Sequence, residues 1–114
     1  MDRKVEEKSF LFAIRIVKLY KYLTDFKREY HLSKQLLRSG TSIGANIAEA
    51  QQAQSRADFV SKLSISLKEA SETDYGLRLL NATEYLSDAE FMSVHSDCTE
   101  LEKMLTAIIK TTKQ

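Results

Sequence analysis

The sequence predicts an all-α fold, an antiparallel four-helix bundle with up-down-up-down connectivity. The chain has 114 residues and no proline, whereas roughly five would be expected at this length. Only three glycines occur, and apolar residues recur at helical spacing along four segments. Because the polar stretches between these segments are short, consecutive helices should lie antiparallel in a single domain spanning residues 1–114.

The first helix is expected from about Lys4 or Lys8 to Leu23, and its apolar arc is unusually broad. A single neighbouring helix covers a narrower stripe than this. The breadth therefore suggests burial on two sides, within the bundle and against another subunit. The arc consists of two rows, Phe10, Ile14 and Val17 in one and Phe12, Ile16, Leu19 and Leu23 in the other.

The second helix is expected from Lys27 to Gln52, after a break at residues 24–27, and it contains several poor helix formers. Gly40 and Gly44 should each cost roughly 1 kcal/mol relative to alanine. Together with Ala48 they are spaced i, i+4, i+8 and line one face. We interpret this face as a surface that the backbone of a neighbouring helix approaches closely.

Two capping signals predict where the third and fourth helices begin. Ser55 is followed by Asp58 and Ser87 by Glu90, the spacing of a capping box. The third helix should end near Asn81, and residues 110–114 should fray. Along the fourth helix, apolar residues recur at intervals of three and four, typical of a helix packed near-parallel to its neighbours. This row comprises Phe91, Val94, Cys98, Leu101, Leu105 and Ile108.

Composition limits the compartment and the partners. Cys98 is the only cysteine, so no internal disulfide can form. No apolar run of about 18 residues and no secretory leader pattern occur, so we expect a cytoplasmic protein without a membrane partner. Up to Arg38 there are ten Lys or Arg against five Asp or Glu, and from Ser39 onward seven against eleven. The basic front and acidic back suit either head-to-tail pairing between copies or a basic face for phosphate.

The sequence predicts no catalytic residue, no metal site and no cofactor. His31 and His95 lack the glutamate three residues earlier that di-iron bundles use, and the position of Cys98 on the apolar row favours a small core residue. Asp74 falls on a buried row and needs partners. The acidic residues of the second and third helices are interpreted as a polar network rather than a metal site. Its expected members are Arg38, Asn46, Glu49, Ser66, Glu69, Ser71, Glu72 and Asp74.

Basic residues are concentrated in the first two helices, interleaved with Tyr20, Tyr22 and Tyr30. Such cations can bind phosphate, and unpaired bases can stack on aromatic rings. The alternative, ordinary solvated helix surfaces, stays open. The candidate nucleic-acid-binding residues are Arg15, Lys18, Lys21, Lys27, Arg28, Lys34 and Arg38.

Residues 32–80 resemble the four-helix-bundle family related to the 23S rRNA intervening-sequence proteins. The family core has the form Q-x-x-R-x-x-x-S-I-x-x-N-I-A-E-G. This chain has Ala50 where that core ends in glycine. Further along, in the third helix, it has Gly76 where an aromatic residue is common in the family. The motif positions matched are Gln35, Arg38, Ser42, Ile43, Asn46, Ile47, Ala48 and Glu49, then Asp58, Phe59, Leu63, Lys68, Glu69, Ala70, Glu72 and Thr73.

The resemblance implies a homopentameric ring of four-helix bundles without catalytic activity. Some members of that family are encoded within intervening sequences of 23S rRNA genes. A similar fold serves as the accessory variability determinant of diversity-generating retroelements, a basic pentamer that binds nucleic acid and a reverse transcriptase. We therefore expect a non-enzymatic binding or scaffold protein with RNA or DNA as the ligand class. The alternative is an adaptor for a protein partner encoded nearby, without nucleic-acid contact.

Overall fold

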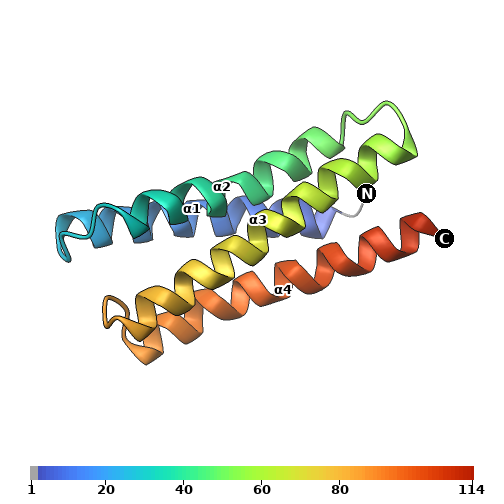
Figure 1. The fold of residues 1–114 in the computed structure, drawn as a ribbon. Coiled ribbons are helices and arrows are strands. Elements are labelled where there is room, and N and C mark those ends of the chain that lie inside the picture. Colours follow the sequence, from blue (N-terminus) through green and yellow to red (C-terminus); the bar gives the residue numbers. More distant parts are fainter. Residues whose placement is uncertain (1–2) are drawn as a thin grey trace.

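The computed structural model describes residues 3–114, which form four helices (Figure 1). They are α1 (Arg3–Asp25), α2 (Leu32–Ala50), α3 (Arg56–Ala82) and α4 (Asp88–Lys113). The helices alternate in direction, which confirms the predicted up-down-up-down bundle. The α1–α2 and α3–α4 connections therefore lie at one end, and both termini lie at the other with the α2–α3 connection. Residues 1 and 2, included in the predicted single domain, lie outside the described residues.

The core lies between all four helices, and each helix contributes fully buried aliphatic or aromatic side chains. Each helix contacts its two neighbours, the α2–α3 interface is the most extensive, and the α1–α4 interface is much the smallest. Truncating one large core side chain to alanine typically costs about 2–5 kcal/mol. The largest buried side chains are Phe12, Ile16, Leu23, Leu36, Ile43, Ile47, Leu63, Leu77, Leu80, Leu101 and Leu105.

The small-residue face of α2 packs directly against α1, as predicted. A Cβ atom added to Gly40 would lie 2.8 Å from the side chain of Ile16. One added to Gly44 would lie 3.3 Å from the backbone oxygen of Ser9. Both distances are shorter than ordinary van der Waals contact, so the glycines set how closely the two helices approach. This close approach accounts for two poor helix formers in the middle of α2.

The predicted start of α2 at Lys27 is wrong, because the helix begins five residues later, at Leu32. The buried carboxylate of Glu29 accepts hydrogen bonds from the backbone N–H groups of Leu32 at 3.0 Å and Ser33 at 2.7 Å. These groups would otherwise have no partner at a helix N-terminus. Arg28 lies in the left-handed region with a φ of 54°, which breaks the helical path just before Glu29. Residues 26–31 therefore form a fixed connection.

The remaining helix ends agree with the sequence except at three points. Ser55 accepts a hydrogen bond from the N–H of Asp58, and Ser87 and Glu90 form the predicted capping box. However, α1 continues to Asp25, α2 ends at Ala50 and α4 continues to Lys113. The predicted fraying of residues 110–114 was therefore wrong for all but the last residue. Two lysines in the last turn of α4 favour the helix by interacting with its dipole.

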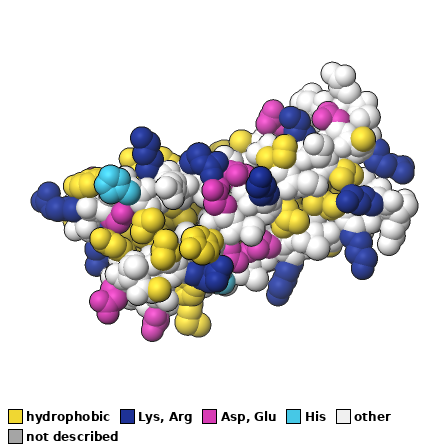
Figure 2. All heavy atoms as spheres, in the orientation of Figure 1, with side chains coloured by type: hydrophobic (Ala, Val, Ile, Leu, Met, Phe, Trp, Pro, Cys, Tyr) yellow, Lys and Arg dark blue, Asp and Glu magenta, His cyan; other side chains and the backbone are white. Residues whose placement is uncertain are grey.

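The apolar row of α1 that contains Phe10, Ile14 and Val17 remains on the surface of the single chain, together with the neighbouring Leu11. Phe10 and Leu11 are 66% and 65% exposed, and Ile14 and Val17 are also exposed. We call these four residues the α1 stripe. They are spaced so that they share one side of the helix. On the face shown in Figure 2, apolar and charged side chains are interspersed. Within residues 3–114, no helix is long and apolar enough to span a membrane.

Candidate functional site

Five of the seven predicted nucleic-acid-binding cations lie at or near the α1–α2 connection. Lys21 is in the last turns of α1, Lys27 and Arg28 are in the connection, and Lys34 is in the first turn of α2. Lys18 lies one turn before Lys21. All five side chains are exposed and form no ion pair with any described residue. Lys and Arg side chains project from this end of the molecule in Figure 2.

The other two predicted cations are held in ion pairs between helices. Arg15 of α1 pairs with Asp97 of α4 at 2.8 Å and also donates to the backbone oxygen of Ser93. Such a pair fixes the guanidinium in one geometry and neutralises its charge. Arg15 therefore connects α1 to α4 and is a weaker candidate for phosphate binding than the lysines.

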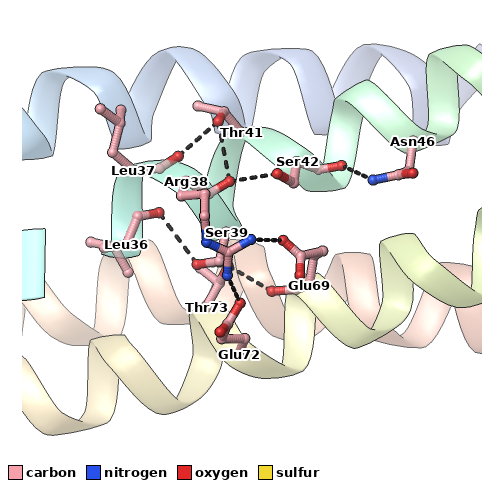
Figure 3. Close-up of polar contacts among 10 residues, drawn as sticks. All are labelled: Leu36, Leu37, Arg38, Ser39, Thr41, Ser42, Asn46, Glu69, Glu72 and Thr73. Atoms are coloured by element: carbon pink, nitrogen blue, oxygen red, sulfur yellow. Dashed lines mark hydrogen bonds and ion pairs between the residues drawn. The ribbon is translucent and has the colours of Figure 1, made fainter. Parts of the chain in front are cut away.

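Arg38 is part of a polar cluster between α2 and α3 (Figure 3). Its guanidinium donates to Glu69 at 2.8 Å and also contacts the carboxylate of Glu72. The hydrogen bond to Glu72, followed by the bond to Glu69, raises the pKa of Arg38. Below this pair, the buried hydroxyl of Thr73 donates to Ser39 at 2.9 Å. Arg38 therefore stabilises the α2–α3 interface.

The sequence predicted that Asn46 and Glu49 would join the Arg38 cluster, and this prediction is wrong. The Asn46 amide donates to the backbone oxygen of Ser42 at 2.8 Å, within α2 itself, and in Figure 3 it meets Ser42 rather than Arg38. Glu49 lies 3.8 Å from Lys62 on α3. Short polar side chains within helices often bond to their own backbone in this way. Gln35, the remaining motif residue, is exposed on α2.

A second polar cluster joins α3 to α4 around Asp74, which the sequence had indicated must find partners. The Asp74 carboxylate lies 2.8 Å from Nε2 of His95 and 3.2 Å from Nε of Arg78. Burial acts to raise the pKa of Asp74, but hydrogen bonds from Glu102 and His95 outweigh it and lower that pKa. Burial, followed by the hydrogen bond and charge of Asp74, raises the pKa of Glu102 to about 7. Asp74 is therefore the more acidic partner, and Glu102 is the one that holds a proton below about pH 7.

Cys98 lies beneath this cluster and has no free thiolate. The side chain is fully buried, and its Sγ donates to the backbone oxygen of Ala70 at 3.4 Å. Burial, and then the nearby charge of Glu102, raises the pKa of the thiol. Because the thiolate is the reactive form, this environment suits a core residue. No group of three or more potential metal ligands occurs among residues 3–114.

The α1 stripe borders a groove between α1 and α2. The groove has a volume of about 660 Å³. Its lining combines Phe10 and small residues of both helices with charged residues of the first turns of α1: Arg3, Glu6, Glu7, Ala13, Gly44, Ala45 and Ala48. A ridge of apolar side chains beside a groove of small ones is a shape that another helix can fill.

Sequence reasoning missed two exposed rings at the α1–α2 connection. Phe26 is 77% exposed, and His31 is also exposed beside the predicted Tyr30. The signal was present, because three ring-bearing residues and two cations lie within residues 26–31. It was obscured by the prediction that the helix began at Lys27.

Comparisons with known proteins agree with this fold. The sequence profile of the 23S rRNA-intervening sequence protein family matches residues 1–107. A crystal structure of a protein of unknown function from the S23 ribosomal protein family of Bacteroides thetaiotaomicron superposes with a TM-score of 0.92. The two sequences are 58% identical, and the match covers 93% of this chain and 98% of the other. None of the curated proteins compared with the chain matches it.

Proposed function

We propose that this chain, which belongs to the family of 23S rRNA-intervening sequence proteins, is a non-enzymatic scaffold that binds RNA or DNA. In this proposal several copies assemble into a ring through α1, and each copy presents its α1–α2 end to phosphate. The observation that supports nucleic-acid binding most directly is the group of exposed cations without ion pairs at that end: Lys18, Lys21, Lys27, Arg28 and Lys34.

The assembly proposal rests on the α1 stripe and the groove beside it. Four large apolar side chains on one side of a helix form a surface larger than scattered exposed residues, and contiguous surfaces of this kind mark interaction sites. A second copy supplies both a ridge and a groove of the same shapes. Such contacts close into a ring when the rotation between copies allows it. Five subunits is the number that the family resemblance implies.

The mass of the purified protein in solution tests the assembly. We expect light scattering at micromolar concentration to give a multiple of the 13.0 kDa chain mass, with five copies as the proposed number. The double variant L11E/I14E should reduce the mass toward one chain while keeping the helical circular dichroism. The control S61E/S64E places the same two charges on the exposed side of α3 and should leave the mass unchanged. A wild-type monomer would refute the ring.

Charge placement supports the α1–α2 end as the phosphate-binding surface. The adjacent α3–α4 connection is acidic, with Glu84, Asp88 and Glu90 exposed at the same end of the bundle. Phosphate should therefore be confined to the α1–α2 side. The net charge of the chain is only +1, so affinity for nucleic acid depends on this local cluster and on its repetition around a ring.

Fluorescence anisotropy at increasing salt tests the binding. Four phosphate contacts per subunit should give a slope of log affinity against log salt of about −3 to −4. The variant K21A/K27A/R28A/K34A should lose most of this affinity. The control R56A/K110A/K113A removes exposed cations from the opposite end and should bind as the wild type does. Failure of the wild type to bind any nucleic acid at low salt would refute this part of the proposal.

A protein-binding adaptor is the second candidate, and the α1 stripe with its groove favours it. The same surface suits an apolar helix of another protein. The two candidates differ in what covers α1 in the purified protein. A monomer that recovers a defined partner after nuclease and high-salt washing, and loses it in L11E/I14E, would favour the adaptor over the ring.

A further inference from the structure

We propose that the α1–α2 connection recognises unpaired bases, so that the ligand is single-stranded rather than duplex nucleic acid. The inference rests on the proposed nucleic-acid binding and adds the structural class of the ligand. It is based on three ring-bearing residues, Phe26, Tyr30 and His31, that lie on one short connection among cations.

The connection is held in one conformation by its own backbone. The N–H of Phe26 bonds to the backbone oxygen of Tyr22, and the N–H of Glu29 bonds to that of Leu23, each at 3.0 Å. The carboxylate of Glu29 then accepts hydrogen bonds from three successive backbone N–H groups, of which the Ser33 bond is the shortest at 2.7 Å. A surface fixed in this way loses little entropy when it binds a ligand.

The inward position of Glu29 leaves the side chains around it directed outward. Phe26 is the most exposed of the large apolar side chains in the described part of the chain, at 77%, and Tyr30 is 53% exposed. The ring of Phe26 pairs with the ring of Tyr22, with the centroids 5.9 Å apart in a tilted arrangement. Tyr30 and His31 have no ring partner among the described residues. The rings therefore present free faces on which a flat ligand can stack.

The chemistry around the rings selects a polyanion with exposed bases. Lys27 and Arg28 lie between Phe26 and Tyr30, and Lys21 and Lys34 flank the connection on the two helices. Lys27 also lies 5.8 Å from the centroid of Tyr22, so it stays beside the rings. Cations beside exposed aromatic rings are the usual platform for single strands, because every base has a face that can stack. In a duplex the bases are already stacked, and only the cations would contribute.

Anisotropy titrations of the full chain with three probes test the inference. The probes are an oligouridine, an oligothymidine and a mixed-sequence duplex, each of about 20 nucleotides or base pairs so that it spans more than one binding site. We expect F26A/Y30A to weaken binding of both single strands by about tenfold or more and to leave duplex binding unchanged. F26W/Y30W should preserve single-strand binding. Different losses with oligouridine and oligothymidine would show whether RNA or DNA is the preferred strand.

Two control variants and the mass of the assembly separate the possible outcomes. Y75A removes an exposed ring from α3 and should bind like the wild type, and K21A/K27A/R28A/K34A should lose single strand and duplex alike. If the wild type binds nucleic acid but F26A/Y30A loses nothing, or loses both forms equally, the inference is overturned while the proposed function stands. If the wild type binds neither form, both fail. If F26A/Y30A lowers the mass of the assembly, the rings are subunit contacts and the inference is overturned.

Discussion

Replacing Glu102 with glutamine should stabilise the protein at alkaline pH and have little effect at acidic pH. In the folded protein Glu102 keeps its proton up to about pH 7 and donates it toward Asp74, which also contacts His95 and Arg78. Glutamine can donate an N–H in the same place and never ionises. The variant therefore preserves the hydrogen bond while removing the like charge that appears when Glu102 loses its proton.

The magnitude follows from the displaced pKa of Glu102. The folded protein retains this proton up to about pH 7, whereas an ordinary glutamic acid releases it near 4.5. Between these values the folded state binds more protons than the unfolded state, so the free energy of unfolding must fall as pH rises. At 1.36 kcal/mol per pKa unit the upper bound is about 3 kcal/mol. Because the side chain is only half-buried and shares its proton with Asp74, we expect about 1–2 kcal/mol.

Thermal unfolding followed by circular dichroism, at about pH 5 and about pH 8 and constant ionic strength, measures this difference. The gain of E102Q over the wild type should increase between the two conditions by about 5 °C or more, since 1 kcal/mol corresponds to roughly 4–8 °C in a domain of this size. E84Q changes an exposed carboxylate that forms no ion pair with any described residue and should show no such increase. A gain that is the same at both pH values would refute the assignment of the proton to Glu102.

Three further substitutions test the packing and the helix start. Gly44→Leu should lower the free energy of unfolding by about 1–3 kcal/mol and disturb assembly, because its side chain would push α1 away at Ser9; an unchanged melting temperature and mass would contradict the close approach. Glu29→Gln should cost about 1 kcal/mol near neutral pH, through loss of charge-assisted bonds to the start of α2. Since the pKa of Glu29 is lowered on folding, that cost should be present above its ordinary value of 4.5 and disappear as pH falls through the folded value, which denaturant titration at several pH values would show. Arg38→Met should cost about 0.5–1 kcal/mol in stability, because its ion pairs are largely exposed, whereas K21A should leave stability unchanged in the same measurement.

Local chemistry explains why some helix boundaries could be predicted from the sequence and others could not. Ser87 and Glu90 are three residues apart and complete each other's hydrogen bonds, so the start of α4 is encoded within one turn. The start of α2 is different, because a glutamate reaches forward from outside the helix and the preceding break depends on the left-handed backbone of Arg28. Neither feature involves the glycine, proline or short polar side chain that normally signals a helix boundary.

The polar clusters show where periodicity stops being informative. The register of α3 was enough to indicate that Asp74 needs partners, although its side chain is only half-buried. It could not identify Glu102, because that assignment depends on how α4 is placed along α3. For Asn46, by contrast, the sequence suggested the wrong partner. Its position suggested a lateral bond, yet the carbonyl of Ser42 in its own helix was the nearer acceptor. Among the cations, composition alone could not separate the paired Arg15 and Arg38 from the lysines at the α1–α2 connection.

The small contact between α1 and α4 determines where this bundle should open. Within the described chain, Arg15–Asp97 and Lys8–Glu100, at 2.8 and 2.9 Å, are the shortest ion pairs across it. Salt weakens such exposed pairs but has little effect on buried apolar contacts. Amide hydrogen exchange should therefore become faster on the facing sides of α1 and α4 at high ionic strength, while the facing sides of α2 and α3 remain protected. The bundle would then behave as a stable α2–α3 hairpin with two outer helices that separate from each other first.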